Sequence, residues 1–268
     1  MSMDKSAIEK IQDLGIQTTK IDNADYPVIS LPKDFNLQSL EAFQKTKYRF
    51  TGTYTTRSLS DFAEYSKQVN SIECFIDEQS MSAESIFDLG DTASPGHAKH
   101  KAVLSLNKTA PFQSVLELDG RAKNQRELAE YLEDWKSYVT VVDVNGDDME
   151  LKKAIAAIRR ITIESTQKSD HESKTYSGSR SSMEELEAST KDGVMPAWII
   201  FSCTPYDQLK SRDFHLRLSL LTEGAPRFKA RITMLETATE EMASEFKELL
   251  TGKLKSENAK IYVGNFKV

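Results

Sequence analysis

The chain of 268 residues has little of what marks secreted, fibrous or membrane proteins. It contains only two cysteines, seven prolines and eleven glycines, which excludes a disulfide scaffold and a collagen-like repeat. Its longest apolar runs have five residues, as in Ala197–Phe201, whereas a membrane-spanning helix needs about 20. The first residues, MSMDKSAIEK, lack the apolar centre of a secretion signal. We therefore expect a cytoplasmic protein without a membrane segment, in which Cys74 and Cys203 are buried free thiols.

What the chain does have is enough apolar surface for a folded core. Hydrophobic residues make up 39% and charged residues 28%, and 35 basic against 41 acidic side chains give a net charge of −6. We interpret residues 1–35 as an N-terminal helix and arm, and residues 36–268 as one domain. Within this domain, the serine-rich stretch 164–193 has a single aromatic residue, Tyr176. It is predicted to be either a flexible excursion or a long solvent-facing hairpin.

Capping residues and periodicity predict the elements of that domain. Ser58 and Asn124 each stand three residues before an acidic residue and an apolar stripe, which indicates the start of a helix. Residues 112–118 fit either a helix or a strand. The predicted strands and helices come in groups and do not alternate strictly. The pattern therefore favours an α+β fold, with largely antiparallel sheets flanked by a few amphipathic helices.

Two segments near the C-terminus make the sharpest prediction. Phe214–Leu220 and Phe228–Met234 both alternate apolar and polar residues, the period of a half-buried strand. If the two strands pair, one face combines His215, Arg217, Arg227, Lys229 and Arg231. Because like charges on one sheet face repel, we expect a counter-charge for them. The phosphates of nucleic acid, the acidic stretch 143–150 and a second subunit all qualify, and a solvated face with local acids is the plain alternative.

A second group of polar residues lies between two predicted strands. Asp88, Asp91, His97 and His100 offer two carboxylates and two imidazoles, a mixture that divalent ions accept. Asp88 and Asp91 are also ordinary turn residues beside Gly90, and a structural turn is the favoured interpretation. Further along, Asp147 or Asp148 is expected to cap a helix over 148–157.

The sequence carries no motif of a common enzyme class. It lacks the glycine-rich phosphate and dinucleotide loops, the nucleophile elbow and zinc-type spacings of cysteine and histidine. We therefore expect no cofactor and favour a protein that is not an enzyme.

Several stretches in fixed order resemble one family. They are Phe50–Tyr54, Phe87–Asp91 followed by Pro95–His97, Leu132–Trp135, Ala154–Ile163, Cys203–Tyr206, Leu216–Leu220 and Tyr262–Phe266. In these stretches the chain resembles the YfdQ-like proteins of phages and prophages. The resemblance implies an accessory protein encoded near replication and recombination functions, and it supplies no reaction and no catalytic residues.

These observations lead to three hypotheses of function. The first is a non-enzymatic, homo-oligomeric protein that binds nucleic acid through His215, Arg217, Arg227, Lys229 and Arg231 during replication or recombination. The second is an antagonist of host defence that binds a defence protein or sequesters a nucleotide signal. The third is a metal-dependent hydrolase built on Asp88, Asp91, His97 and His100.

Overall fold

A computed structural model describes residues 5–6, 19–20, 29–30, 41–69, 72–160, 195–221, 226–255 and 259–267. The chain forms two compact units, Met1–Phe50 and Thr51–Val268. In the first unit, β1 (Thr19–Lys20) pairs with β2 (Ile29–Ser30), and η1 (Glu41–Phe43) is a 3-10 turn. Most of the helix predicted in the N-terminal arm, and the whole excursion predicted over 164–193, lie outside the described residues.

The second unit contains a mixed sheet of five strands in the order β13-β4-β5-β6-β3. Its strands are β3 (Gly52–Thr56), β4 (Ile72–Asp77), β5 (Ser82–Ile86), β6 (His100–Ser105) and β13 (Ala259–Val263). The central pairs are antiparallel, whereas β13 runs parallel to β4 and β3 runs parallel to β6. Helix α2 (Leu59–Lys67) packs beside this sheet, and the Ser58 side chain accepts the N–H of Asp61 as predicted.

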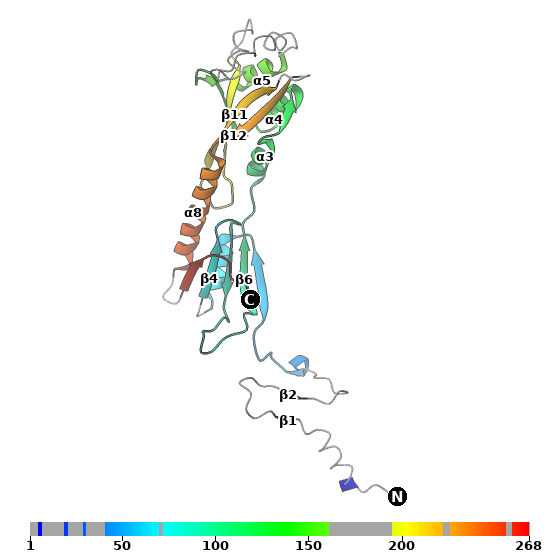
Figure 1. Cartoon of the computed structure of the whole chain (residues 1–268), viewed down its shortest axis with the longest axis vertical. Coiled ribbons are helices and arrows are strands. Elements are labelled where there is room, and N and C mark those ends of the chain that lie inside the picture. The colour runs from blue at the N-terminus through cyan, green and yellow to red at the C-terminus, as the bar shows by residue number, and fades with distance from the viewer. Residues whose placement is uncertain are drawn as a thin grey trace, which may run out of the picture. The chain divides into compact units, whose positions relative to one another are not determined.

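A second sheet has six strands, all antiparallel, in the order β7-β12-β11-β10-β8-β9. Its strands are β7 (Ala122–Asn124), β8 (Val139–Asp143), β9 (Asp148–Met149), β10 (Pro196–Cys203), β11 (Arg212–Leu221) and β12 (Arg227–Ile232). The two sheets and their helices confirm the α+β class (Figure 1).

Three helices cover one face of the six-stranded sheet: α3 (Ala110–Leu118), α4 (Gln125–Asp134) and α5 (Leu151–Arg160). The ambiguous segment 112–118 is helical because the Thr109 side chain caps it and Pro111 suits the first turn. The predicted capping box of α4 is confirmed, since the Asn124 side chain accepts the N–H of Glu127 and the Glu127 carboxylate accepts the N–H of Asn124.

The predicted cap of α5 is wrong. Asp148 belongs to β9, and the helix begins only at Leu151. The carboxylate that organises this region is that of the buried Asp143, which accepts the N–H groups of Asn145 (2.8 Å) and Asp147 (2.9 Å). Asp147 therefore lies in a tight turn between β8 and β9, and Asp148 lies in β9, before the helix starts.

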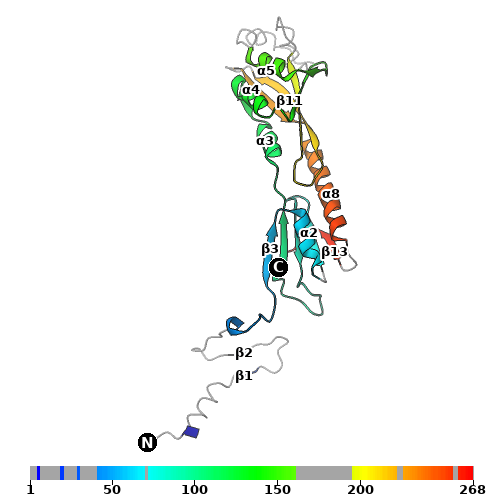
Figure 2. The ribbon, with the colours of Figure 1, turned by 180° about the vertical axis from the view of Figure 1, so that it is seen from behind.

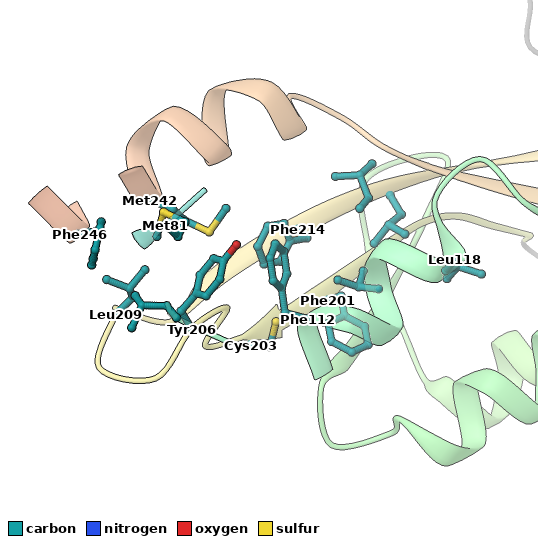
Figure 3. Packing of buried hydrophobic residues seen from close by; sticks show 14 of the residues in the cluster. Met81, Phe112, Leu118, Phe201, Cys203, Tyr206, Leu209, Phe214, Met242 and Phe246 are labelled. Atoms are coloured by element: carbon teal, nitrogen blue, oxygen red, sulfur yellow. The ribbon is translucent and has the colours of Figure 1, made fainter. Parts of the chain in front are cut away.

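Helix α8 (Leu235–Leu254) joins the two sheets of this unit (Figures 1 and 2). Its 20 residues span about 30 Å at the usual helical rise. Met242 and Phe246 point into a continuous apolar core with Met81, beside the first sheet, and with Leu209, just before β11 (Figure 3). An ion pair between Arg212 Nη1 and Glu245 Oε2 (2.7 Å) also ties β11 to this helix.

Cys74 and Cys203 are buried free thiols, as predicted. Burial raises the pKa of each thiol to about 11. Among the described residues, no helix has the length and apolar character needed to cross a membrane.

Candidate nucleic-acid interface

The candidate interface is the face of the six-stranded sheet that lies opposite α3, α4 and α5. Phe214 stacks on Phe112 of α3 (5.0 Å between ring centroids), and Phe201 contacts Trp135 at the end of α4 (6.0 Å). Because side chains alternate along a strand, the neighbours of Phe214 and Phe201 point the other way. On β11, His215 and Arg217 are exposed between buried residues.

The register of β11 and β12 brings the predicted basic residues together. Arg217 lies opposite Arg231, and Ser219 lies opposite Lys229. Residues directly opposite each other share a face, so one surface carries all five predicted side chains. We call it the basic face: His215, Arg217, Arg227, Lys229 and Arg231. Lys229 is half-buried and the other four are exposed. The pairing and the shared face are as predicted; binding of nucleic acid by these residues stays a prediction.

In the part of the chain that the structure describes, the cations of the basic face form no ion pair with a carboxylate. Two acidic residues share this face: Asp213, whose carboxylate accepts the Ser202 hydroxyl (2.6 Å), and Asp148 from the stretch 143–150, which lies opposite Val142 in the row of Trp198. Because neither acid forms an ion pair with a cation of the face, solvent or a bound anion can screen the repulsion among the cations.

Two further basic residues, just before β11 and at its first position, do not join the basic face. Arg212 points to the opposite face of β11, toward α8, where Glu245 and Glu241 contact it. Lys210 precedes the strand, and its backbone N–H donates to Glu245 Oε1 (2.8 Å). Both belong to the contact between the sheet and α8.

Sequence reasoning missed Trp198 as a member of this surface. From the sequence, Trp198–Cys203 is interpreted as a buried strand, because the run Ala197–Phe201 is apolar throughout. In the structure, Ile199 and Phe201 are buried, whereas Trp198 and Ile200 are half-buried on the other side. Trp198 lies opposite Arg217, so one row across the sheet runs Trp198, Arg217, Arg231. The one indication in the sequence was the polar Ser202, which lies an even number of residues from Trp198 and therefore points to the same face of the strand.

The candidate metal residues form a turn. Asp88 accepts the N–H groups of Lys99 and His100, and Asp91 accepts those of Ala93 and Ser94. His100 Nε2 contacts the Tyr65 hydroxyl (3.3 Å), and His97 is exposed. Across the described ranges, no group of three or more His, Cys, Asp or Glu residues could hold a metal ion.

The fold and this surface define a class: an α+β protein with a cationic sheet face that none of the described helices covers. The model of a family described as an uncharacterized conserved protein (DUF2303) matches residues 1–266. The chain therefore belongs to this family. No curated protein and no solved structure matches it.

Proposed function

We propose that this protein binds single-stranded nucleic acid on the basic face, without selecting a base sequence. The observation that carries the proposal is the row formed by Trp198, Arg217 and Arg231. Proteins that bind single strands combine cations that track the phosphates with aromatic rings on which bases stack. The row offers both groups side by side, and Lys229 and Arg227 continue the cations along β12.

The net charge of −6 makes the local arrangement decisive. A polyanion is repelled by the protein as a whole and attracted only where cations gather. Binding is therefore expected to weaken steeply with salt, because each phosphate contact releases a counterion. Each contact with a single strand contributes about −0.7 to the slope of log affinity against log salt concentration.

The test measures the affinity of the protein for a fluorescein-labelled oligothymidylate by anisotropy, between about 50 and 200 mM salt. The variant with Arg217→Glu and Lys229→Glu is expected to lose binding, because it removes two cations and adds two anions on one face. A control variant with Lys67→Glu and Lys152→Glu changes the net charge equally at exposed positions on α2 and α5. Binding that ignores salt, or that both variants weaken equally, contradicts the proposal.

As part of this proposal, we place the binding in replication or recombination of phage or prophage DNA in the bacterial cytoplasm, in line with the resemblance to YfdQ-like proteins. We also propose that the protein acts as a homo-oligomer, because open sheet edges favour self-association. Mass measurement in solution, with and without the oligonucleotide, tests assembly and binding together. A monomer under both conditions contradicts the oligomer.

A further inference from the structure

A pocket of about 340 Å³ opens on the helical side of the six-stranded sheet, away from the basic face. Residues of α3, α4 and β7 and the turn before β7 line it. Its volume lies within the range of small-molecule sites, roughly 300–1,000 Å³. Nothing in the proposed binding of nucleic acid on the basic face uses this pocket.

One side of the pocket is aromatic and held in place. Tyr131 and Trp135, from α4 and its C-terminal end, line it. Behind them, Phe201 lies 6.4 Å from Tyr131 and 6.0 Å from Trp135, measured between ring centroids. The Tyr131 hydroxyl accepts a hydrogen bond from Ser114 (3.1 Å). These contacts fix both rings before any ligand arrives, which lowers the entropy cost of stacking a planar group on them.

The other side of the pocket is cationic. Arg121 and Lys123 line it, and neither forms an ion pair with a carboxylate among the described residues. Lys123 is half-buried on β7, opposite Phe228, so its side chain points to the helical side of the sheet. An arginine and a lysine placed together are the groups that proteins use to hold phosphate.

Gln113 and Glu117 supply polar groups of a different kind on α3. The carboxylate of Glu117 repels a ligand that is only an anion, such as free phosphate, and so weakens its binding at Arg121 and Lys123. It does suit a ligand that carries hydrogen-bond donors in addition to its anionic group. Exocyclic amino and ring N–H groups of a nucleobase are such donors.

From this combination we infer that the pocket binds a nucleoside monophosphate. The base stacks on Trp135 and Tyr131, and its donors face Glu117 or Gln113. The phosphate lies at Arg121 and Lys123. The inference does not depend on the basic face, and either site can exist without the other.

The two tryptophans of the chain make the test specific. Trp135 lines the pocket and Trp198 lies on the basic face, so the variant Trp198→Phe leaves Trp135 as the sole indole. AMP, CMP, GMP and UMP are each titrated into this variant while indole fluorescence is recorded. We expect at least one of them to quench Trp135 fluorescence in a saturable way. Adenosine alone and inorganic phosphate alone should each bind with an affinity at least about tenfold lower.

Replacement of the cations completes the test. In the Trp198→Phe background, Arg121→Ala with Lys123→Ala is expected to weaken the nucleotide by about tenfold or more, because two charge-assisted contacts are lost. Lys67→Ala with Lys152→Ala is the matched control and should leave binding unchanged. The inference is overturned if none of the four nucleotides gives saturable quenching of Trp135 fluorescence at concentrations up to about 1 mM. It is also overturned if the two double variants bind the nucleotide equally well. Loss of oligothymidylate binding in the Arg217 and Lys229 variant leaves the pocket result unaffected, so the two proposals fail separately.

Discussion

Arg217 and Arg231 lie directly opposite each other on neighbouring antiparallel strands, with their side chains on the same face of the sheet. Directly opposed like charges on a sheet face destabilise the sheet. No described carboxylate pairs with either guanidinium. The arrangement therefore lowers stability where a bound polyanion would restore it.

Removing the repulsion between Arg217 and Arg231 should have opposite effects on the stability of the protein and on its affinity for nucleic acid. Arg231→Glu places opposite charges across the strands, and we expect it to raise the free energy of unfolding by about 0.2–1 kcal/mol in urea titration. It should also weaken oligothymidylate binding. Arg227→Glu is the matched control, because Arg227 lies opposite Leu221. That change should weaken binding without the gain in stability. Equal stability changes in the two variants would speak against the repulsion.

Trp198 is expected to contribute to binding through its ring face. Stacking of one base on an aromatic side chain contributes about 1–3 kcal/mol, so Trp198→Ala should lower oligothymidylate affinity by about fivefold to more than a hundredfold. Ile200→Ala is the control, since Ile200 is a half-buried apolar neighbour on the same face. Its loss should change affinity by less than about twofold. Similar losses in both variants would assign the effect to the fold and not to stacking.

The contact between Glu245 and Arg212 should make stability depend on acid pH. Partial burial acts to raise the pKa of Glu245, but hydrogen bonds from the Arg212 guanidinium and the Lys210 backbone outweigh it and lower the pKa. A carboxyl with a lowered folded-state pKa stabilises the fold above its unfolded pKa, about 4.3. That stabilisation is lost as pH falls through the folded-state pKa.

We expect Glu245→Gln to destabilise the protein by about 1–3 kcal/mol at pH 7. The difference from the unmodified protein should shrink as the pH falls below about 4. Glu241→Gln is the control, because Glu241 is 65% exposed and lies 3.9 Å from Arg212, whereas Glu245 is 11% exposed. Thermal unfolding, followed by circular dichroism between pH 7 and about pH 4, measures the stability of both variants. A difference that stays constant with pH would contradict the assignment.

The two thiols should be inert in the folded protein. Cys74 and Cys203 are buried, and burial raises each pKa to about 11, whereas an unfolded cysteine has a pKa of about 8.5. At pH 8, a chromogenic disulfide reagent should label neither thiol of the native protein and both thiols in denaturant. Rapid labelling of the native protein would show that one of them is accessible.

The loop between β5 and β6 depends on a glycine. A side chain at Gly96 would overlap the backbone carbonyl of Asp88, whose carboxylate accepts the N–H groups of Lys99 and His100. Gly96→Ala should therefore displace this loop and lower the thermal midpoint by several degrees. Gly252→Ala is the control, since a Cβ there meets no atom within 4 Å and the position is helical. It should be neutral or stabilising.

Local patterns were sufficient to predict the pairing of β11 with β12, but not the strands β7, β8 and β9 of the same sheet. The alternation in Phe214–Leu220 and Phe228–Met234 determines which side of each strand is buried, and the short connection favours their pairing. The end of the second strand is wrong, because β12 stops at Ile232 and Met234 is exposed just before α8. The box of Asn124 and Glu127 was predictable because all its partners lie within one turn. The basic face follows directly from these two strands.

Features that depend on distant contacts were not predictable in this way. The apolar run around Trp198 predicts a core residue. In the structure Trp198 is half-buried, because the described helices cover only the other face of this sheet. The aspartates before α5 resemble a helix cap, yet their turn is organised by Asp143. The pocket unites α3, α4 and β7, and no motif connects these segments in the sequence.

The parallel pairing of β13 with β4 has a consequence for synthesis of the chain. Ala259–Val263 completes a sheet whose next strand, Ile72–Asp77, leaves the ribosome far earlier. Until Ala259–Val263 emerges from the exit tunnel, the backbone of β4 has an open edge toward other nascent chains. A product cut short by a premature stop codon would keep that edge permanently, and we expect such fragments to aggregate or be degraded.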